Sequence, residues 1–225
     1  AFLTERPIGS LYTQQCQAAG SMAAAYSQKS VGVGALRLDA SGIEETDEFA
    51  NNTGVFDVID FTLIAGGGVA ILPQLGIGGA VKYYSQTLPE NSGKGFTGDV
   101  GLLFATPSNK LRIGAVVKNI AGELKYESGY TDAFDRCFGA GVALYPIENL
   151  LIAADIIYQD GIEGRVGGEY ELGRIRLRAG GAFGAGRTSV SAGAGFAVSG
   201  FSIDYAYQTH NILPDSHRLS LGMKF

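Results

Sequence analysis

The chain is poor in cysteine, tryptophan and charge, and these shortages set the first limits on what it is. Its 225 residues include two cysteines and no tryptophan, and only 17% of them are charged. Cys16 and Cys137 are too far apart in sequence for the short spacings of zinc or redox motifs, so we expect two unpaired small apolar residues. The net charge of −5 offers no basic footprint for nucleic acid, which we therefore do not expect as a partner.

A leader and a transmembrane helix are also not evident. Residues 1–7 contain no apolar stretch of the kind found in a secretory signal peptide, so we expect a mature or trimmed form. Residues 61–81 are nearly free of polar residues and are about long enough to cross a bilayer as a helix. They contain Gly66, Gly67, Gly68 and Pro73, however, and glycine and proline are the poorest helix formers. Two strands joined by a tight turn at 72–74 are the better interpretation.

The chain does have a strong two-residue period, which is clearest in its last ten residues. Large apolar side chains alternate there with small, polar or charged ones. The apolar set is Leu219, Leu221, Met223 and Phe225, and the other set is Arg218, Ser220, Gly222 and Lys224. This is the pattern of a strand with hydrocarbon on one side and water on the other. A terminal strand that ends in Phe resembles the C-terminal insertion signal of bacterial outer-membrane barrels.

The same alternation recurs in about fourteen segments, the first of them within residues 3–13. Alternation alone would also suit a soluble β-sandwich, so the connections decide between the two. Tight turns are predicted at 28–30, 72–74, 107–109, 146–149, 172–173 and 199–200, whereas loops at 40–56, 86–95 and 121–135 on the other side are long. Short periplasmic turns and longer extracellular loops are typical of bacterial barrels. In the early strands Arg37 shares a face with Val31 and Val33, which predicts a bulge or a shifted register.

We therefore predict an all-β fold, a closed antiparallel transmembrane β-barrel of about fourteen strands. Residues 1–225 are expected to form one domain in the bacterial outer membrane. An even strand number places both termini in the periplasm. Membrane lipid or lipopolysaccharide is the expected surrounding.

Several motifs resemble one family of such barrels. They are Lys110–Ile120, Gly167–Tyr170, Leu177–Gly180, Asp204–Tyr207 and His217–Leu221. Together they resemble the PorV/PorQ-type proteins, which share the FadL-like fold. The resemblance implies a non-enzymatic barrel that docks protein partners in a type IX-like secretion assembly, or alternatively a FadL-like transporter of hydrophobic or amphiphilic solutes. The Gly/Ala-rich opening with an Asn-Pro-Ala-Gly-like motif, which fills the lumen in FadL-type barrels, is missing, so no N-terminal plug is expected.

The strand register places charged side chains of both signs on the inner face. They are Lys82, Asp99, Arg112, Lys118, Asp155, Arg165, Glu169, Arg176, Arg178, Asp204 and Arg218. We expect a charge network across the lumen, either as a structural filling or as an electropositive path for an anionic or amphiphilic solute. Large apolar residues on the inner face are few, namely Leu103, Val116, Leu151 and Ile157, and this favours docking over transport.

The long loops offer candidate contacts but no catalytic site. Tyr126, Tyr130 and Phe134 lie in the loop 121–135 and would either cover the barrel mouth or face a partner. The acidic run 44–48 lacks the ligand spacing of a calcium loop, and His210 and His217 lack cysteines or placed carboxylates. No Gly-x-Ser-x-Gly motif occurs. We therefore expect no catalytic residue, metal or cofactor.

Overall fold

The computed structural model describes residues 7–15, 19–46, 48–49, 51–89, 91–184, 186–211 and 214–225. Strands form all the regular structure in these ranges, and they contain no helix long and apolar enough to cross a membrane. The strands are β1 (Pro7–Gln15), β2 (Ala19–Gln28), β3 (Val31–Thr46), β4 (Asn52–Leu72), β5 (Leu75–Thr87), β6 (Ser92–Ala105), β7 (Leu111–Lys118), β8 (Glu123–Tyr126), β9 (Thr131–Ala133), β10 (Cys137–Ile147), β11 (Leu150–Tyr158), β12 (Ile162–Leu172), β13 (Ile175–Gly184), β14 (Arg187–Val198), β15 (Phe201–His210) and β16 (Ser216–Lys224).

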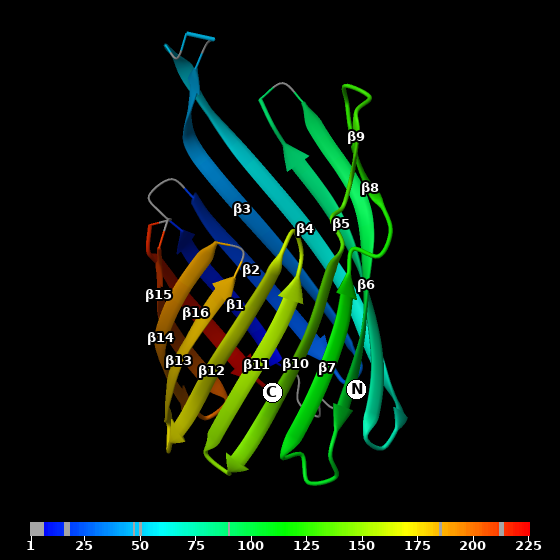
Figure 1. Ribbon diagram of the computed structural model, residues 1–225, viewed down its shortest axis with the longest axis vertical. Coiled ribbons are helices and arrows are strands. Elements are labelled where there is room, and N and C mark those ends of the chain that lie inside the picture. Colours follow the sequence, from blue (N-terminus) through cyan, green and yellow to red (C-terminus); the bar gives the residue numbers. More distant parts are fainter. Residues whose placement is uncertain are drawn as a thin grey trace.

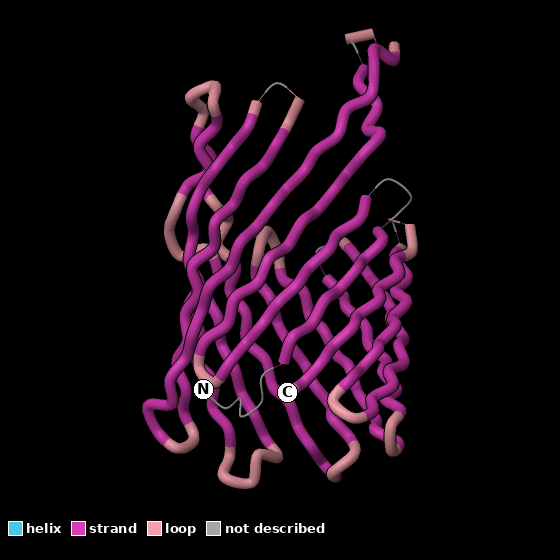
Figure 2. The backbone as a smooth tube through the Cα atoms, turned by 180° about the vertical axis from the view of Figure 1, so that it is seen from behind, coloured by secondary structure: helices cyan, strands magenta, loops and turns pink. Residues whose placement is uncertain are grey.

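Fourteen of these strands close into one antiparallel barrel, as predicted (Figure 1). Each pairs with its neighbours in the chain, except that β7 pairs with β10 and the short β8–β9 hairpin extends the sheet above β6. The first strand closes on the last, from Pro7 opposite Lys224 to Gln15 opposite Ser216. The start of β1 and the end of β16 therefore lie together, at the end of the barrel that carries the short turns (Figure 2). Closure leaves no barrel strand without a partner on either side.

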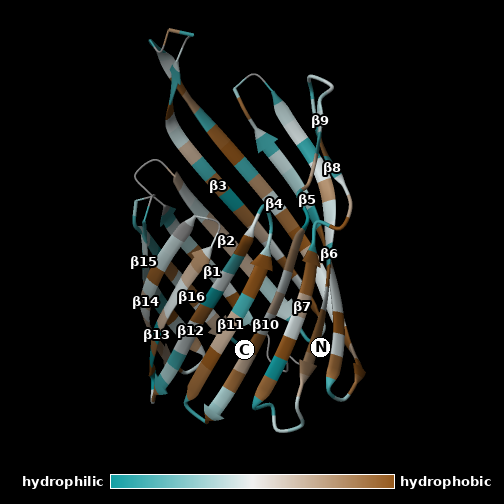
Figure 3. Cartoon of the chain, viewed as in Figure 1, coloured by the Kyte–Doolittle hydropathy of each residue, from teal (hydrophilic) through white to brown (hydrophobic). Residues whose placement is uncertain are grey.

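The apolar side chains point outward rather than into a core. Ala105 and Cys137 are the only apolar side chains that are buried among the described residues, and Cys137 is a free thiol. The C-terminal set, Leu219, Leu221, Met223 and Phe225, is 40–72% exposed on the outer face. Figure 3 shows the resulting alternation of hydrophobic and hydrophilic bands along the strands. A sandwich would bury one face of each sheet in an apolar core, so this structure excludes the sandwich alternative.

The connections confirm the predicted asymmetry but not the predicted loops. The tight turns lie where they were predicted, and Ser199 and Gly200 have φ angles of 48° and 81°, as in a two-residue hairpin turn. The expected loop at 40–56 was wrong, because β3 and β4 remain paired up to Thr46 opposite Asn52. Most of 121–135 is likewise the β8–β9 hairpin. The long side of the barrel is therefore built mainly from extended hairpins.

The early register has no defect at Arg37. The β3–β4 ladder is continuous from Val31 to Ala40, and its irregularity lies between Ala40 and Ile43. Arg37 remains on the outer face, where its Nη2 lies 2.6 Å from Oδ1 of Asp39, two residues further along the same strand. The two charges neutralise each other, so the outer face accepts them without a bulge.

The two faces of β16 should respond differently to the same substitution. We expect Leu221→Arg to lower the free energy of unfolding in lipid by about 2–4 kcal/mol, because the charge would enter the apolar belt. Ser220→Arg adds the same charge on the inner face, opposite Asp204, and should cost much less. Chemical unfolding in lipid vesicles measures both, and an equal loss for the two variants would contradict the assignment of the faces.

Candidate functional site

The inner face borders an open cavity of about 740 Å³. It lies against β5, β6, β7, β10 and β11, and glycine occupies several of the inner positions on the first four of these strands. The inner-face glycines are Gly76, Gly78, Gly101, Gly114, Gly139 and Gly141. Leu103, Val116 and Ile157, three of the four apolar residues predicted on the inner face, also line this space. Glycine leaves volume where any other residue would fill the lumen, so the shortage of large inner side chains creates an apolar cavity rather than excluding one.

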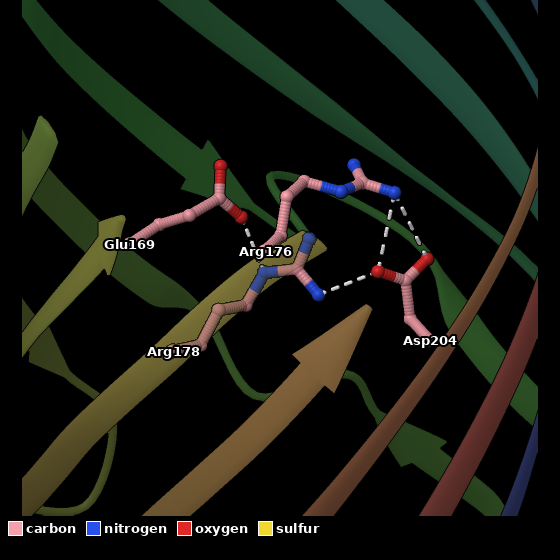
Figure 4. A network of polar contacts seen from close by, with 4 residues as sticks. All are labelled: Glu169, Arg176, Arg178 and Asp204. Carbon is pink, nitrogen blue, oxygen red and sulfur yellow. Dashed lines mark hydrogen bonds and ion pairs between the residues drawn. The ribbon is translucent and has the colours of Figure 1, made fainter. Parts of the chain in front are cut away.

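Two arginines and two carboxylates form a charged cluster on another part of the inner wall (Figure 4). Arg178 pairs through Nε with Glu169 and through Nη1 with Oδ1 of Asp204, at 2.7 Å in the second case. Arg176 reaches the same Asp204 oxygen at 3.3 Å. The cluster therefore joins β12, β13 and β15.

Glycines on β14 make this cluster possible. Gly193 stands opposite Arg178, and Gly195 stands between Arg176 and Asp204 in the register. A Cβ at Gly195 would collide with the Asp204 carboxylate. The carboxylate and the guanidinium groups can meet across an intervening strand because that strand has no side chain at this point.

A second charged cluster closes around Lys82. Its Nζ lies 2.7 Å from Oδ1 of Asp99 and donates a hydrogen bond of 2.6 Å to Oδ1 of Asn119. The side chain of Lys82 is 9% exposed. Asn119, at a φ of 56°, donates its backbone N–H to Asp99 and its Nδ2 to the carbonyl of Asp135. The cluster thus ties β5 and β6 to the point where the chain leaves β7.

The remaining predicted lumen charges do not join one network. Arg165 pairs with Glu163 on its own strand, and Arg218 donates to Gln208. The guanidinium of Arg112 lies over the Tyr145 ring at 5.3 Å. Lys118 and Asp155 form no ion pair within the described residues. The inner wall therefore carries two separate clusters and several single charges.

Sequence reasoning missed Glu163 and Asn119. A period of two would have found Glu163, which shares a face with Arg165. No sequence pattern indicated Asn119, because its role depends on a left-handed backbone conformation at the end of β7.

The aromatic residues of the β8–β9 region divide between two environments. Tyr126 donates its hydroxyl proton to Oε1 of Gln86 at 2.7 Å, and the Phe134 ring lies 5.1 Å from that of Tyr84. The centroid of the Tyr130 ring lies 6.0 Å from that of Tyr126, and Tyr130 is 65% exposed. Two of the three predicted partner-facing rings therefore pack onto β5, and only Tyr130 is mainly exposed.

The histidines and the other candidate metal ligands do not assemble. His217 shares a hydrogen bond with Tyr205, and His210 contacts Ser216. In the described part of the chain no three histidine, cysteine, aspartate or glutamate side chains are placed to hold a metal. Asp47 of the acidic run and Cys16 lie outside the described residues.

Comparison with known proteins supports the architecture. No family model and no curated sequence matches the chain. Among solved structures it is similar to the P. putida toluene transporter TodX, at 12% identity and a TM-score of 0.69 over 98% of this chain and 90% of that one. It is also similar to the Ralstonia pickettii toluene transporter TbuX, at 14% identity and a TM-score of 0.65 over 98% of this chain and 88% of that one. A Pseudomonas aeruginosa FadL homologue is similar at 9% identity and a TM-score of 0.66, over 100% of this chain and 91% of that one.

The fold is that of the FadL-type outer-membrane barrels. At these identities the likeness establishes the fold alone. None of it favours the PorV/PorQ-type proteins in particular, since no sequence match supports that narrower resemblance. The three FadL-type neighbours are named as transporters or as a FadL homologue, and none is named as a secretion component or an enzyme.

Substitution of two arginines tests whether the clustered charges contribute more to stability than a single ion pair does. Arg178→Gln leaves Glu169 without its partner, and we expect it to lower the free energy of unfolding by about 1–2 kcal/mol. Arg165→Gln removes an arginine whose side chain is 53% exposed and whose one ion pair is local, so its effect should stay within about 0.5 kcal/mol. Unfolding titrations in lipid give both values. Equal losses for the two variants would show that the cluster stabilises the barrel no more than a single exposed ion pair does.

Lys82 tests the second cluster. Lys82→Met strands the Asp99 carboxylate in a largely buried setting, and we expect a loss of about 3 kcal/mol in unfolding free energy. The double variant Lys82→Met/Asp99→Asn removes the stranded charge and keeps an acceptor for the Asn119 N–H, so it should recover part of that loss. A double variant that is less stable than Lys82→Met would refute this account.

Proposed function

We propose that the chain transports small hydrophobic or amphiphilic solutes across a bacterial outer membrane through the barrel lumen. The observation that carries this proposal is the apolar, glycine-lined cavity inside the wall formed by β5, β6, β7, β10 and β11. Its location inside a closed barrel gives a solute an environment shielded from the bilayer. The FadL-type neighbours named as toluene transporters are consistent with this class of solute.

The interior chemistry favours an amphiphilic solute as well as a purely apolar one. The cavity lining includes Asp99 and Arg112 beside its glycines. Polar groups at the edge of an apolar space orient a molecule with one polar end, as in most small-molecule sites. The short turns, the start of β1 and the end of β16 lie at one end of the barrel. We assign this end to the periplasm, because bacterial barrels have their short turns on the periplasmic side.

The docking role in a type IX-like assembly, which the PorV/PorQ resemblance implies, has weaker support. Two of the three aromatic rings expected to face a partner pack onto β5 instead. Purification in mild detergent with mass analysis of co-migrating species separates the two functions. A stoichiometric protein partner would favour docking, whereas a lone barrel that carries bound lipid or fatty acid would favour transport.

Filling the cavity should block transport. Gly114→Phe projects a ring into the lumen, and a Cβ there would meet its nearest atoms at ordinary contact distances of 3.7 and 3.8 Å. Gly168→Phe is the matched control, because Gly168 lies on the outer face and its Cβ would meet only the Leu151 carbonyl, at 3.5 Å. Uptake of radiolabelled toluene and decanoic acid is measured in Gram-negative cells that express each barrel.

We expect the unaltered chain and Gly168→Phe to raise uptake above that of cells without the barrel, and Gly114→Phe to return it close to that background. Outer-membrane fractions are probed in parallel, so that a variant that fails to insert is recognised. If the unaltered barrel, present in the membrane, does not raise the uptake of either solute, the transport proposal is wrong.

A further inference from the structure

The outer face of the barrel has an apolar hollow on the same stretch of wall that borders the lumen cavity, and residues of β5, β6, β7, β10 and β11 line both spaces. One row of neighbouring outer residues crosses four strands in register, with short side chains in the middle and long ones at the ends. It runs Leu102, Ala115, Ala140, Ile156 from β6 to β11. The next row includes Phe138 and Tyr158, whose rings lie 6.4 Å apart. The two alanines therefore form the floor of a hollow of about 620 Å³ with walls of bulky apolar side chains.

A cationic pocket lies directly beyond this hollow, toward the long hairpins. It has a volume of about 670 Å³, and Lys94, Lys125, Arg136 and the carboxylate of Glu123 are on its lining. Phe138 and Val100 line the hollow. Arg136 precedes Phe138 by two residues, and Lys94 precedes Val100 by six residues on β6. All three cations are exposed and have no ion pair or hydrogen bond through their side chains within the described residues. The pocket thus has a positive charge that the protein does not compensate.

We propose that the hollow and the cationic pocket together bind a phosphorylated glycolipid of the lipid A type. An acyl chain occupies the hollow, which is continuous with the apolar belt of the barrel. The phosphate groups contact Lys94, Lys125 and Arg136, since phosphate forms charge-assisted hydrogen bonds with lysine and arginine. Basic pockets at the edge of the membrane-spanning region are typical sites for anionic lipid headgroups.

The charge count and the location favour this lipid over the alternatives. Three cations and one carboxylate leave a surplus of positive charge that suits more than one phosphate. A zwitterionic phospholipid would bring its own ammonium group into this surplus. A second copy of the barrel would bring a second cationic pocket against the first and be repelled. The long hairpins mark the extracellular end in bacterial barrels, which places the site in the outer leaflet, and the assignment is independent of the solute in the lumen.

Native mass spectrometry of the delipidated full chain tests the proposal, with lipid A and phosphatidylethanolamine titrated separately. We expect one lipid A to bind more tightly than phosphatidylethanolamine. The triple variant Lys94→Gln/Lys125→Gln/Arg136→Gln should weaken lipid A binding by about tenfold or more, since it removes every cationic donor to the phosphate groups. The triple variant Lys29→Gln/Lys110→Gln/Arg174→Gln removes the same charge at the short turns and should bind as the unaltered chain does.

The hollow is tested separately with Ala140→Phe, which fills it. The matched control Ala194→Phe adds the same ring to the outer face of β14, where the neighbouring outer residues are Leu177 and Tyr205. We expect Ala140→Phe alone to weaken lipid A binding. Equal binding of phosphatidylethanolamine, equal weakening by the two triple variants, or a two-barrel mass that Ala140→Phe abolishes would each overturn the proposal.

Discussion

Closure of the sheet is the constraint on which the rest of this structure depends. In hydrocarbon no water satisfies an open strand edge, so a membrane-spanning sheet must pair its first strand with its last. The ladder from Pro7 opposite Lys224 to Gln15 opposite Ser216 does this. Once the sheet is closed, a period of two can only place side chains in lipid or in the lumen. This explains why so few apolar side chains are buried among the described residues and why the outer belt is apolar.

Closure also creates an interior volume that side chains fill or leave open, and glycine has a different effect on this volume in two parts of the wall. On β14, Gly193 and Gly195 allow Asp204 to reach the arginines of β13, so charge fills the lumen there. On β6, β7 and β10, Gly101 and Gly139 lie on either side of Val116 in the register, and Gly114 lies opposite Gly141, so no large charged side chain fills this part of the lumen and space remains. The same residue type thus supports an ion cluster on one part of the wall and a cavity on another. A count of large inner side chains could not distinguish these outcomes.

The sequence was sufficient to predict which face each strand residue occupies, but not which inner residues meet. Leu219, Leu221 and Met223 could be assigned to the outer face because a period of two is a local property. Whether Arg165 pairs with Asp155 or Glu163 depends on rotamers and on the register between strands, which no single segment encodes. The strands within 40–56 were missed because acidic residues and a glycine interrupt their apolar pattern, although the ladder continues through them. For the Lys82–Asp99–Asn119 cluster, the face pattern placed Lys82 and Asp99 on the inner wall but indicated neither their pairing nor the part played by the asparagine.

That cluster links the inner and outer surfaces of the barrel. Asn119 is held by Asp99 and Lys82 and in turn holds the carbonyl of Asp135, so the chain leaves β7 and re-enters β10 at a determined place. The hairpin between these two points places Tyr126 and Phe134 on β5, over the lumen side. It also brings Lys125 and Arg136 to the lining of the cationic pocket on the outer face. A loss of Lys82 would therefore disturb the mouth of the lumen and the proposed lipid site together, whereas a loss of Arg178, which lies on a separate part of the wall, would disturb neither.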